Sequence, residues 1–199
     1  KCSVVLTYDD ALNVHLDNVI PVLDSLNLKG TFYLTASSDA ATNRIKDWRK
    51  AATDGHELGN HTLYHPCDAT GEGMSWVKPE YDLSKYSLLK IQDEIKVCNN
   101  YLKAIDGKTK RTFAFTCGHK KVAEGEFIQT LSNEFIAART VRGEMHPFDE
   151  QKLMDMDCYS MEGKTGEQMI ELVKQAQKSG KLLVFLFHGV GGEHSLNVS

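Results

Sequence analysis

Apolar and polar residues follow two periods along the chain, and each period predicts one type of element. Short apolar runs predict strands over residues 4–8, 31–35, 111–116, 134–140 and 181–187, with a shorter strand in HELGNH at 56–61. Apolar residues spaced three and four apart predict helices over residues 14–26, 40–53, 83–105, about 122–132 and 166–179. Residues 66–82 carry two prolines and two glycines, so we expect a long loop there.

Alternation of strands with helices predicts parallel strands that are covered by helices. With six or seven strands in 199 residues, the fold class is α/β, and we expect a small or incomplete β/α barrel rather than an open sheet. In both architectures the functional site lies at the carboxyl ends of the strands. Residues 1–199 are expected to form a single domain. Because the sequence begins with Lys1 and not with a start methionine, we expect it to be a segment of a longer chain.

Composition narrows the classes of partner. The formal net charge is −4, which gives no electrostatic reason to expect nucleic acid as a partner. No apolar stretch approaches the roughly 20 residues that a membrane span needs. The sequence does not predict an oligomeric state.

Polar residues stand at the end of one predicted strand after another. They are Asp9 and Asp10, His61 and His65, Cys117 with Gly118, Arg139, and His188. Because the carboxyl ends of parallel strands meet at one end of the fold, these side chains are expected to lie close together. For the adjacent acids, the alternative is that they simply cap the next helix.

His61 and His65 form an HxxxH pair, which a helix or a tight turn can direct at one ion. Together with a carboxylate from another strand end, they supply three ligands and leave a position open for water. This donor set is what a catalytic divalent cation requires. We expect one ion, zinc first, with cobalt, nickel or manganese as alternatives.

Three motifs resemble those of the polysaccharide deacetylases, the NodB-homology enzymes of carbohydrate esterase family 4. TYDDAL is similar to their TFDDG motif, HELGNHTLYH to their H(S/T)xxH motif, and LLVFLFHG to their final Leu-x-His motif. The three occur in the family's order across residues 7–189. The resemblance implies a distorted (β/α)7 barrel and an acetylated carbohydrate substrate.

The resemblance also implies roles for individual residues. Asp9 would be the catalytic base, His188 the general acid, and Leu186 a wall of the acetyl pocket; Asp10, His61 and His65 would be the metal ligands. The backbone N–H of Cys117 would stabilise the oxyanion, because the family uses an amide at that turn.

Two family motifs have no clear match. The third should supply an arginine that orients the base, but Ala114 stands at that position, while Gly118 is retained. Arg139 is our candidate replacement, ahead of Arg111 and Arg142, and the alternative is an ordinary salt-bridged arginine. The fourth, an Asp-Trp signature, has no counterpart in MDMDCYSMEG (154–163).

Five cysteines occur without a CxxC pair, so a four-cysteine zinc site is not expected. Cys67 follows His65 by two residues and Cys117 lies in the third-motif turn. If both loops border one site, the two cysteines come within disulfide range; otherwise they are unpaired thiols. A disulfide and a polysaccharide substrate agree with an exported protein, whether periplasmic, cell-surface or secreted.

The sequence therefore predicts a metal-dependent carbohydrate deacetylase, with N- and O-linked acetyl groups both open. The alternatives are a metal amidohydrolase acting on a small acylated molecule, and a catalytically silent carbohydrate-binding domain. Among the other residues, Trp48 is expected in the core, and Trp76 is the better candidate for contact with a sugar. His15 and His146 are expected to be solvated or capping side chains. His119 and His194 lie near the predicted site, where substrate contact is the alternative to the favoured interpretation of an ordinary side chain.

Overall fold

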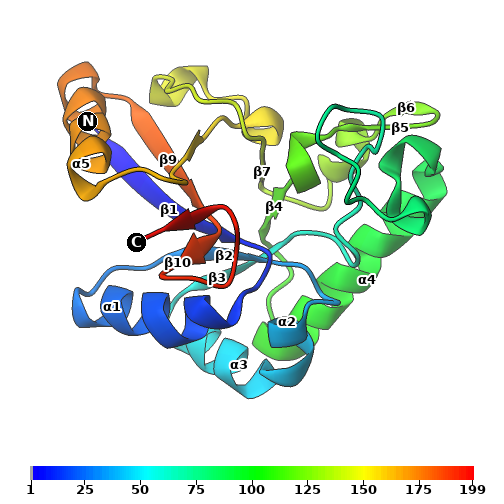
Figure 1. The fold of residues 1–199 in the computed structure, drawn as a ribbon, viewed down its shortest axis with the longest axis horizontal. Helices are drawn as coiled ribbons and strands as arrows, with labels where there is room; N and C mark the ends of the chain where they lie inside the picture. The colour runs from blue at the N-terminus through cyan, green and yellow to red at the C-terminus, as the bar shows by residue number, and fades with distance from the viewer. Residues whose placement is uncertain (1) are drawn as a thin grey trace.

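A computed structural model describes residues 2–199, and within them seven strands form one curled, parallel sheet (Figure 1). The sheet order is β7-β4-β3-β2-β1-β9-β8. Its strands are β1 Ser3–Asp9, β2 Thr31–Leu34, β3 Glu57–Asn60, β4 Thr112–Ala114, β7 Ala137–Arg139, β8 Tyr159–Ser160 and β9 Leu182–Phe187. β1 lies near the middle, with Tyr8 opposite Phe187 on one side and Asp9 opposite Tyr33 on the other.

One extended segment links the two edges of this sheet. Met156 pairs with β7, because its N–H donates to Ala138 O and its carbonyl accepts from Thr140 N, both at 2.8 Å. A few residues later β8 pairs with β9 in parallel. The sheet is therefore a partly closed barrel, which confirms the predicted distorted and incomplete (β/α)7 fold.

Helices connect the strands in the order that the sequence predicts. They are α1 Ile20–Ser25, preceded by a π-helical turn at His15–Val19, α2 Asp39–Asn43, α3 Ile45–Thr53, α4 Leu88–Asp106 and α5 Gly166–Ser179. α4 begins at Ser87, whose side chain accepts from Lys90 N, and ends at Gly107 in a left-handed conformation. None of the helices in residues 2–199 combines the length and the hydropathy of a membrane-spanning segment.

The helix predicted over 122–132 is wrong. A small antiparallel hairpin forms instead, from β5 Lys121–Val122 and β6 Gly125–Glu126, followed by a 3₁₀ turn at Ile128–Leu131. Gly125 has a φ of 125°, which a helix cannot contain. Val122, Phe127 and Leu131 are still buried together, so their helix-like spacing reflects a shared core and not a helix.

Smaller differences concern boundaries. The helix predicted over 40–53 is divided at Arg44 into α2 and α3, and the one predicted from residue 83 starts at Leu88. The remaining strands are β10 Gly189–Val190 and β11 Asn197–Val198; the other 3₁₀ turns are Pro79–Tyr81, Leu83–Lys85, Thr116–Gly118, Phe148–Glu150 and Leu153–Asp155.

Aromatic packing holds the central strands against α1 to α4. Phe32 is fully buried, its ring stacks on Tyr8 with centroids 4.9 Å apart, and the ring of Trp48 lies 5.7 Å away. Trp48 is itself fully buried, as predicted. Because Tyr8 directly precedes Asp9, this cluster fixes the end of β1 from which the acidic pair projects.

Phe32→Ala should lower the free energy of unfolding by about 3–5 kcal/mol, because it removes a fully buried ring and leaves a cavity. Urea unfolding followed by circular dichroism measures this. The control is Leu89→Ala on the exposed face of α4, where 64% of the residue is accessible and a change within about 0.5 kcal/mol is expected. Equal losses in the two variants would contradict this description of the core.

Candidate catalytic and metal-binding site

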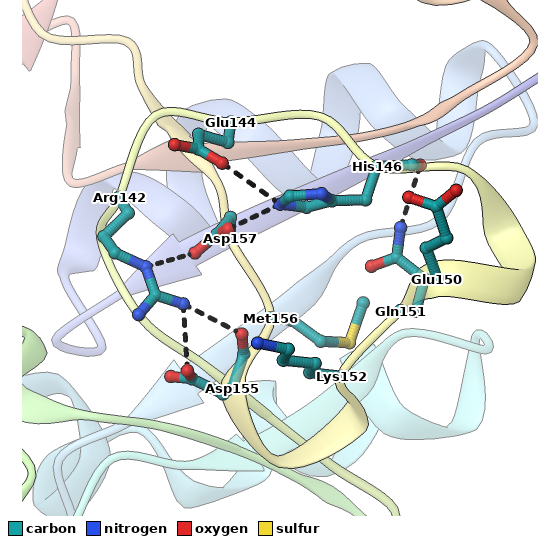
Figure 2. Close-up of a pocket in the computed structure, with 9 residues that line it drawn as sticks. All are labelled: Arg142, Glu144, His146, Glu150, Gln151, Lys152, Asp155, Met156 and Asp157. Carbon is teal, nitrogen blue, oxygen red and sulfur yellow. Dashed lines mark hydrogen bonds and ion pairs between the residues drawn. The ribbon is translucent and has the colours of Figure 1, made fainter.

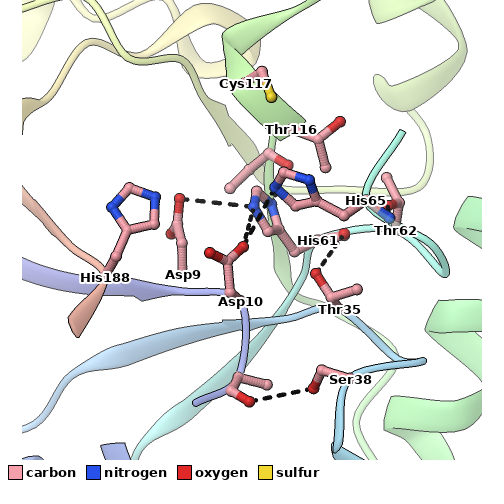
Figure 3. A network of polar contacts seen from close by, with 12 residues as sticks. Asp9, Asp10, Thr35, Ser38, His61, Thr62, His65, Thr116, Cys117 and His188 are labelled. Carbon is pink, nitrogen blue, oxygen red and sulfur yellow. Dashed lines mark hydrogen bonds and ion pairs between the residues drawn. The ribbon is translucent and has the colours of Figure 1, made fainter. Parts of the chain in front are cut away.

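The two adjacent carboxylates reach the same site because the backbone turns sharply after β1. Asp10 and Ala11 have φ values of 79° and 56°, in the left-handed region that non-glycine residues seldom adopt. In a continuing strand, Asp9 and Asp10 would point to opposite faces. Figure 3 shows them side by side, between His188 on one side and the imidazoles of His61 and His65 on the other.

The predicted metal ligands come together. Asp10 Oδ1 lies 3.4 Å from His61 Nε2 and 3.3 Å from His65 Nε2. The donor atoms of the three residues all lie within 4.8 Å of one another. Within residues 2–199, Asp10 Oδ1 is buried and accepts no hydrogen bond, so the site holds an unpartnered carboxylate oxygen between two imidazoles. A divalent cation fits this donor set.

The two imidazoles have different surroundings. His61 Nδ1 donates to the carbonyl of Ala114 at 2.9 Å, which leaves its Nε2 lone pair directed toward Asp10. Burial lowers the pKa of His65 to about 4, although Asp10 acts in the opposite direction, so this ring is neutral at pH 7. Burial also acts to lower the pKa of His61, but Asp9 and Asp10 outweigh it and the net pKa is raised.

A turn, and not a helix, brings the HxxxH pair together. Thr62 and His65 both have left-handed φ values, of 67° and 54°. The side chain of Asn60 accepts from Thr62 N at 2.8 Å, and Thr62 Oγ1 accepts from His65 N at 3.0 Å. These bonds hold the tight turn after β3.

Asp9 forms a buried ion pair with Arg139. Arg139 Nη2 donates to both carboxylate oxygens, at 2.5 and 2.6 Å, while Nη1 donates to the carbonyl of Thr140 at 2.9 Å. Burial acts to raise the pKa of Asp9, but Arg139, followed by His61 and His188, lowers it below its ordinary value. This contact keeps Arg139 as the candidate replacement for the arginine missing at Ala114.

His188 follows the last central strand, and its backbone is held by a histidine that the sequence analysis did not assign to the site. His15 is fully buried, so the expectation of a solvated side chain is wrong. Its Nδ1 accepts from Leu12 N, and its Nε2 therefore donates to the carbonyl of His188 at 2.7 Å. The available signal was its spacing of four from Val19, which places His15 on the apolar face.

A cavity of about 280 Å³ is bordered by five polar residues of the site: Asp9, Asp10, His61, His65 and His188. Leu186 and Cys117 also line it, as predicted, whereas Gly118 is not among its lining residues in the described part of the chain. Gly118 instead permits the turn: its φ is 70°, and a Cβ there would meet Val141 at 2.6 Å. Trp76 lines the cavity with 58% of its surface exposed.

The predicted disulfide is confirmed. Cys67 and Cys117 are bonded, with Cα atoms 5.9 Å apart. The bond joins the segment that carries His65 to the turn after β4. Cys67 Sγ also lies 3.6 Å from His65 Nδ1.

A second polar cluster lines a larger cavity of about 550 Å³ (Figure 2). There Asp157 Oδ1 accepts from Arg142 Nε at 2.6 Å, and Asp157 Oδ2 lies 2.8 Å from His146 Nε2. Glu144 Oε2 lies 3.4 Å from the same nitrogen. Both carboxylate oxygens of Asp157 thus have hydrogen-bond partners. In the smaller cavity, by contrast, Asp10 Oδ1 has no hydrogen-bond partner among the described residues, which makes that cavity the candidate site.

Sequence comparison identifies one matching family and a distant relative. The family model for polysaccharide deacetylase matches residues 1–129. Over 102 residues, or 51% of the chain, the sequence is 28% identical to the uncharacterized protein YlxY of Bacillus subtilis. That match spans only 27% of YlxY.

Solved structures share the fold at low identity. Deacetylase PplD of Streptococcus pyogenes matches with a TM-score of 0.62 and 19% identity, over 78% of this chain and 62% of that one. The catalytic domain of a peptidoglycan N-acetylglucosamine deacetylase from Eubacterium rectale gives 0.56 and 21%, over 93% and 75%. A pseudoenzyme of carbohydrate esterase family 4 from Bacillus anthracis gives 0.50 and 16%, over 93% and 64%.

Arg139→Met should lower the free energy of unfolding by about 3–5 kcal/mol, because it removes the hydrogen-bonded counter-charge of the buried Asp9 carboxylate. Combining it with Asp9→Asn should recover more than half of that loss. Urea unfolding in the presence of a chelator measures both. Lys50→Met, which breaks an exposed pair with Asp54, is the control and should cost less than about 1 kcal/mol. A loss for Arg139→Met no larger than the control's would contradict the buried pair.

Alkylation of the denatured protein should label Cys2, Cys98 and Cys158 without reductant, and Cys67 and Cys117 only after reduction, because the last two are bonded to each other. Peptide mass spectrometry identifies the labelled positions. Labelling of Cys67 or Cys117 without reductant would rule out the bond.

Proposed function

The chain belongs to the polysaccharide deacetylase family, and from this premise we propose that it is a metal-dependent hydrolase that removes acetyl groups from a polysaccharide or oligosaccharide. The proposal rests on one arrangement of side chains. Asp10 Oδ1, which accepts no hydrogen bond in the described residues, lies beside the imidazoles of His61 and His65. Next to it are the carboxylate of Asp9, which the buried Arg139 orients, and the imidazole of His188. N-linked and O-linked acetyl groups both remain candidates.

Asp10, His61 and His65 would hold one divalent cation. Carboxylate and imidazole donors suit zinc, and cobalt, nickel and manganese are the alternatives. When bound, such a cation supplies Lewis-acid chemistry, polarising a carbonyl oxygen and making water more acidic. The unpartnered Asp10 oxygen supports this assignment, because a buried carboxylate oxygen is costly without a cationic or hydrogen-bonding partner.

Asp9 is proposed as the general base. Its lowered pKa keeps the carboxylate ionised at neutral pH, so it can accept a proton from the attacking water. Arg139 contacts both oxygens of Asp9 and would hold the carboxylate in one orientation. As water adds to the acetyl carbon, its proton passes to Asp9.

His188 is proposed as the general acid. Burial lowers its pKa, while the neighbouring carboxylates of Asp9 and Asp10 favour the protonated ring that would donate. It would protonate the leaving sugar nitrogen or oxygen as the bond to the acetyl carbon breaks. His15 would keep His188 in place through its hydrogen bond to the backbone carbonyl.

The acetyl group would lie between Leu186 and the turn that contains Cys117, since both line the cavity. Leu186 provides an apolar contact for the methyl group. The backbone N–H of Cys117 is the proposed donor to the developing oxyanion. Within the cavity, Trp76 offers an exposed ring on which a sugar could stack.

A catalytically silent carbohydrate-binding domain is the second candidate. The similarity to a pseudoenzyme and the missing Asp-Trp signature favour it. The convergence of Asp9, Asp10, His61, His65 and His188 in one cavity supports catalysis more strongly, since binding alone does not require these five groups.

We also propose an exported location for this single domain, supported by its disulfide.

Asp9→Asn should keep the cation and lose turnover, whereas Asp10→Asn should lose both. In Asp9→Asn, the amide oxygen can still accept from Arg139, but no base remains, so kcat should fall about 10²- to 10⁴-fold. Bound zinc is measured by elemental analysis after reconstitution, and acetate release is measured on N-acetylglucosamine oligomers and acetylated xylan.

His119→Ala is the matched control, because this half-buried histidine accepts a backbone N–H from Asp68 and does not belong to the cation donor set. It should keep both metal and turnover. Wild-type protein that binds zinc but releases acetate from neither substrate would favour the silent domain. Unchanged metal content and turnover in both Asp9→Asn and Asp10→Asn would contradict the assignment of roles.

A further inference from the structure

Residues 189–198 form a compact wall of the site, and all of them except Gly189 lie beyond the final family motif. β10 and β11 pair in parallel, Gly189 N donates to Leu196 O at 3.0 Å, and Gly192 N donates to the side chain of Asn197 at 2.9 Å. Gly189 is required here, because a Cβ would lie 2.5 Å from the carbonyl oxygen of Gly192. Figure 1 shows β10 beside the helical segment that follows β1.

This segment is anchored to the loop that carries the acidic pair. The carboxylate of Glu193 accepts from Val14 N and from the side chain of Asn13, both at 2.7 Å. Asn18 donates to the carbonyl of Val190 at 2.9 Å. The position of residue 194 is therefore fixed relative to Asp10.

His194 projects from this segment into the same cavity. Its Nδ1 accepts from Leu196 N at 3.0 Å, so in the neutral ring Nε2 carries the hydrogen. Nε2 lies 3.7 Å from Asp10 Oδ2, and the ring is stacked on His188, with centroids 5.0 Å apart and planes 14° apart. The two oxygens of Asp10 thus have different neighbours: Oδ1 faces His61 and His65, and Oδ2 faces His194.

We propose that His194 is a positioning residue that orients Asp10 for cation binding, an inference that rests on the proposed function. At 3.7 Å the contact is electrostatic and too long for a direct hydrogen bond. The Nε2–H dipole stabilises negative charge on Oδ2 and leaves Oδ1 free for the cation. Stacking against His188 prevents the imidazole from turning away. Groups that orient a metal ligand through a hydrogen bond typically contribute 10- to 100-fold to metal affinity, which sets the scale of the expected effect.

The test measures zinc affinity of the full chain by competition with a chromophoric chelator. His194→Ala should raise the zinc Kd about 10- to 100-fold. His194→Gln, whose amide can present an N–H near the position of Nε2, should restore the Kd to within about threefold of wild type. Thermal unfolding of the metal-free proteins should be unchanged in both variants. Rescue by glutamine separates orientation of Asp10 from a general effect on the fold.

His119→Ala is the control, because its Nδ1 also accepts a backbone N–H but it does not line the cavity formed by described residues. A zinc Kd for His194→Ala equal to that of the control would overturn the proposal. The absorption spectrum of the cobalt-loaded protein adds a second criterion. It should be unchanged in His194→Gln, and a changed band would mean that His194 is itself a ligand, which also overturns the positioning role.

These outcomes are distinguishable from failure of the proposed function. If wild-type protein binds zinc but releases no acetate, catalysis fails as a proposal while the Kd comparison still decides the role of His194. If wild-type protein binds no zinc, both proposals are overturned together.

Discussion

The ion pair between Arg139 and Asp9 is the interaction on which the site depends. In the sheet order, β7 and β1 are separated by three other strands, so their side chains can meet only because the sheet curls. The interior is then closed enough to exclude water from the pair, which makes an unpaired charge there costly. Met156 pairs with Arg139 at the edge of the sheet. Through Arg139, the curvature of the sheet therefore determines the orientation of Asp9, the proposed base.

Unfavourable backbone conformations gather around the same cavity. In the described part of the chain, non-glycine residues with left-handed φ include Asp10, Thr62, His65, Cys117 and Glu193. Each costs free energy that must be offset by surrounding contacts. At Asp10 this conformation turns the side chain of Asp10 toward the same site as Asp9. At His65 it directs the imidazole back toward Asp10 at the end of β1. At Cys117 it forms part of a turn that the disulfide with Cys67 stabilises. The apolar packing of the central strands stabilises this arrangement.

The sequence predicted those parts of the fold and site that follow from strand ends. Asp10 and its imidazole partners could be identified because parallel strands place their carboxyl ends together, and Arg139 was a candidate for the same reason. His15 was missed although its spacing marked it as buried, because a polar residue was not expected on an apolar face. His194 was expected near the site, with an ordinary side chain favoured over substrate contact. Its approach to Asp10 could not be predicted, since its position depends on a turn whose contacts are made with residues about 180 positions away. The hairpin at Gly125 was mistaken for a helix because apolar spacing does not distinguish the two when all the residues reach one core.

The parallel register of β1 has a consequence for how this fold can vary in evolution. Successive side chains of a strand alternate between faces, so a change of one residue in the length of β1 would exchange the directions of all of its side chains. Tyr8 would leave its aromatic stack, and the acid that follows it would no longer meet Arg139. Insertions and deletions are therefore expected to be excluded from this strand and to accumulate in distant loops. In this strand, length is therefore expected to be under stronger selection than the identity of most of its residues.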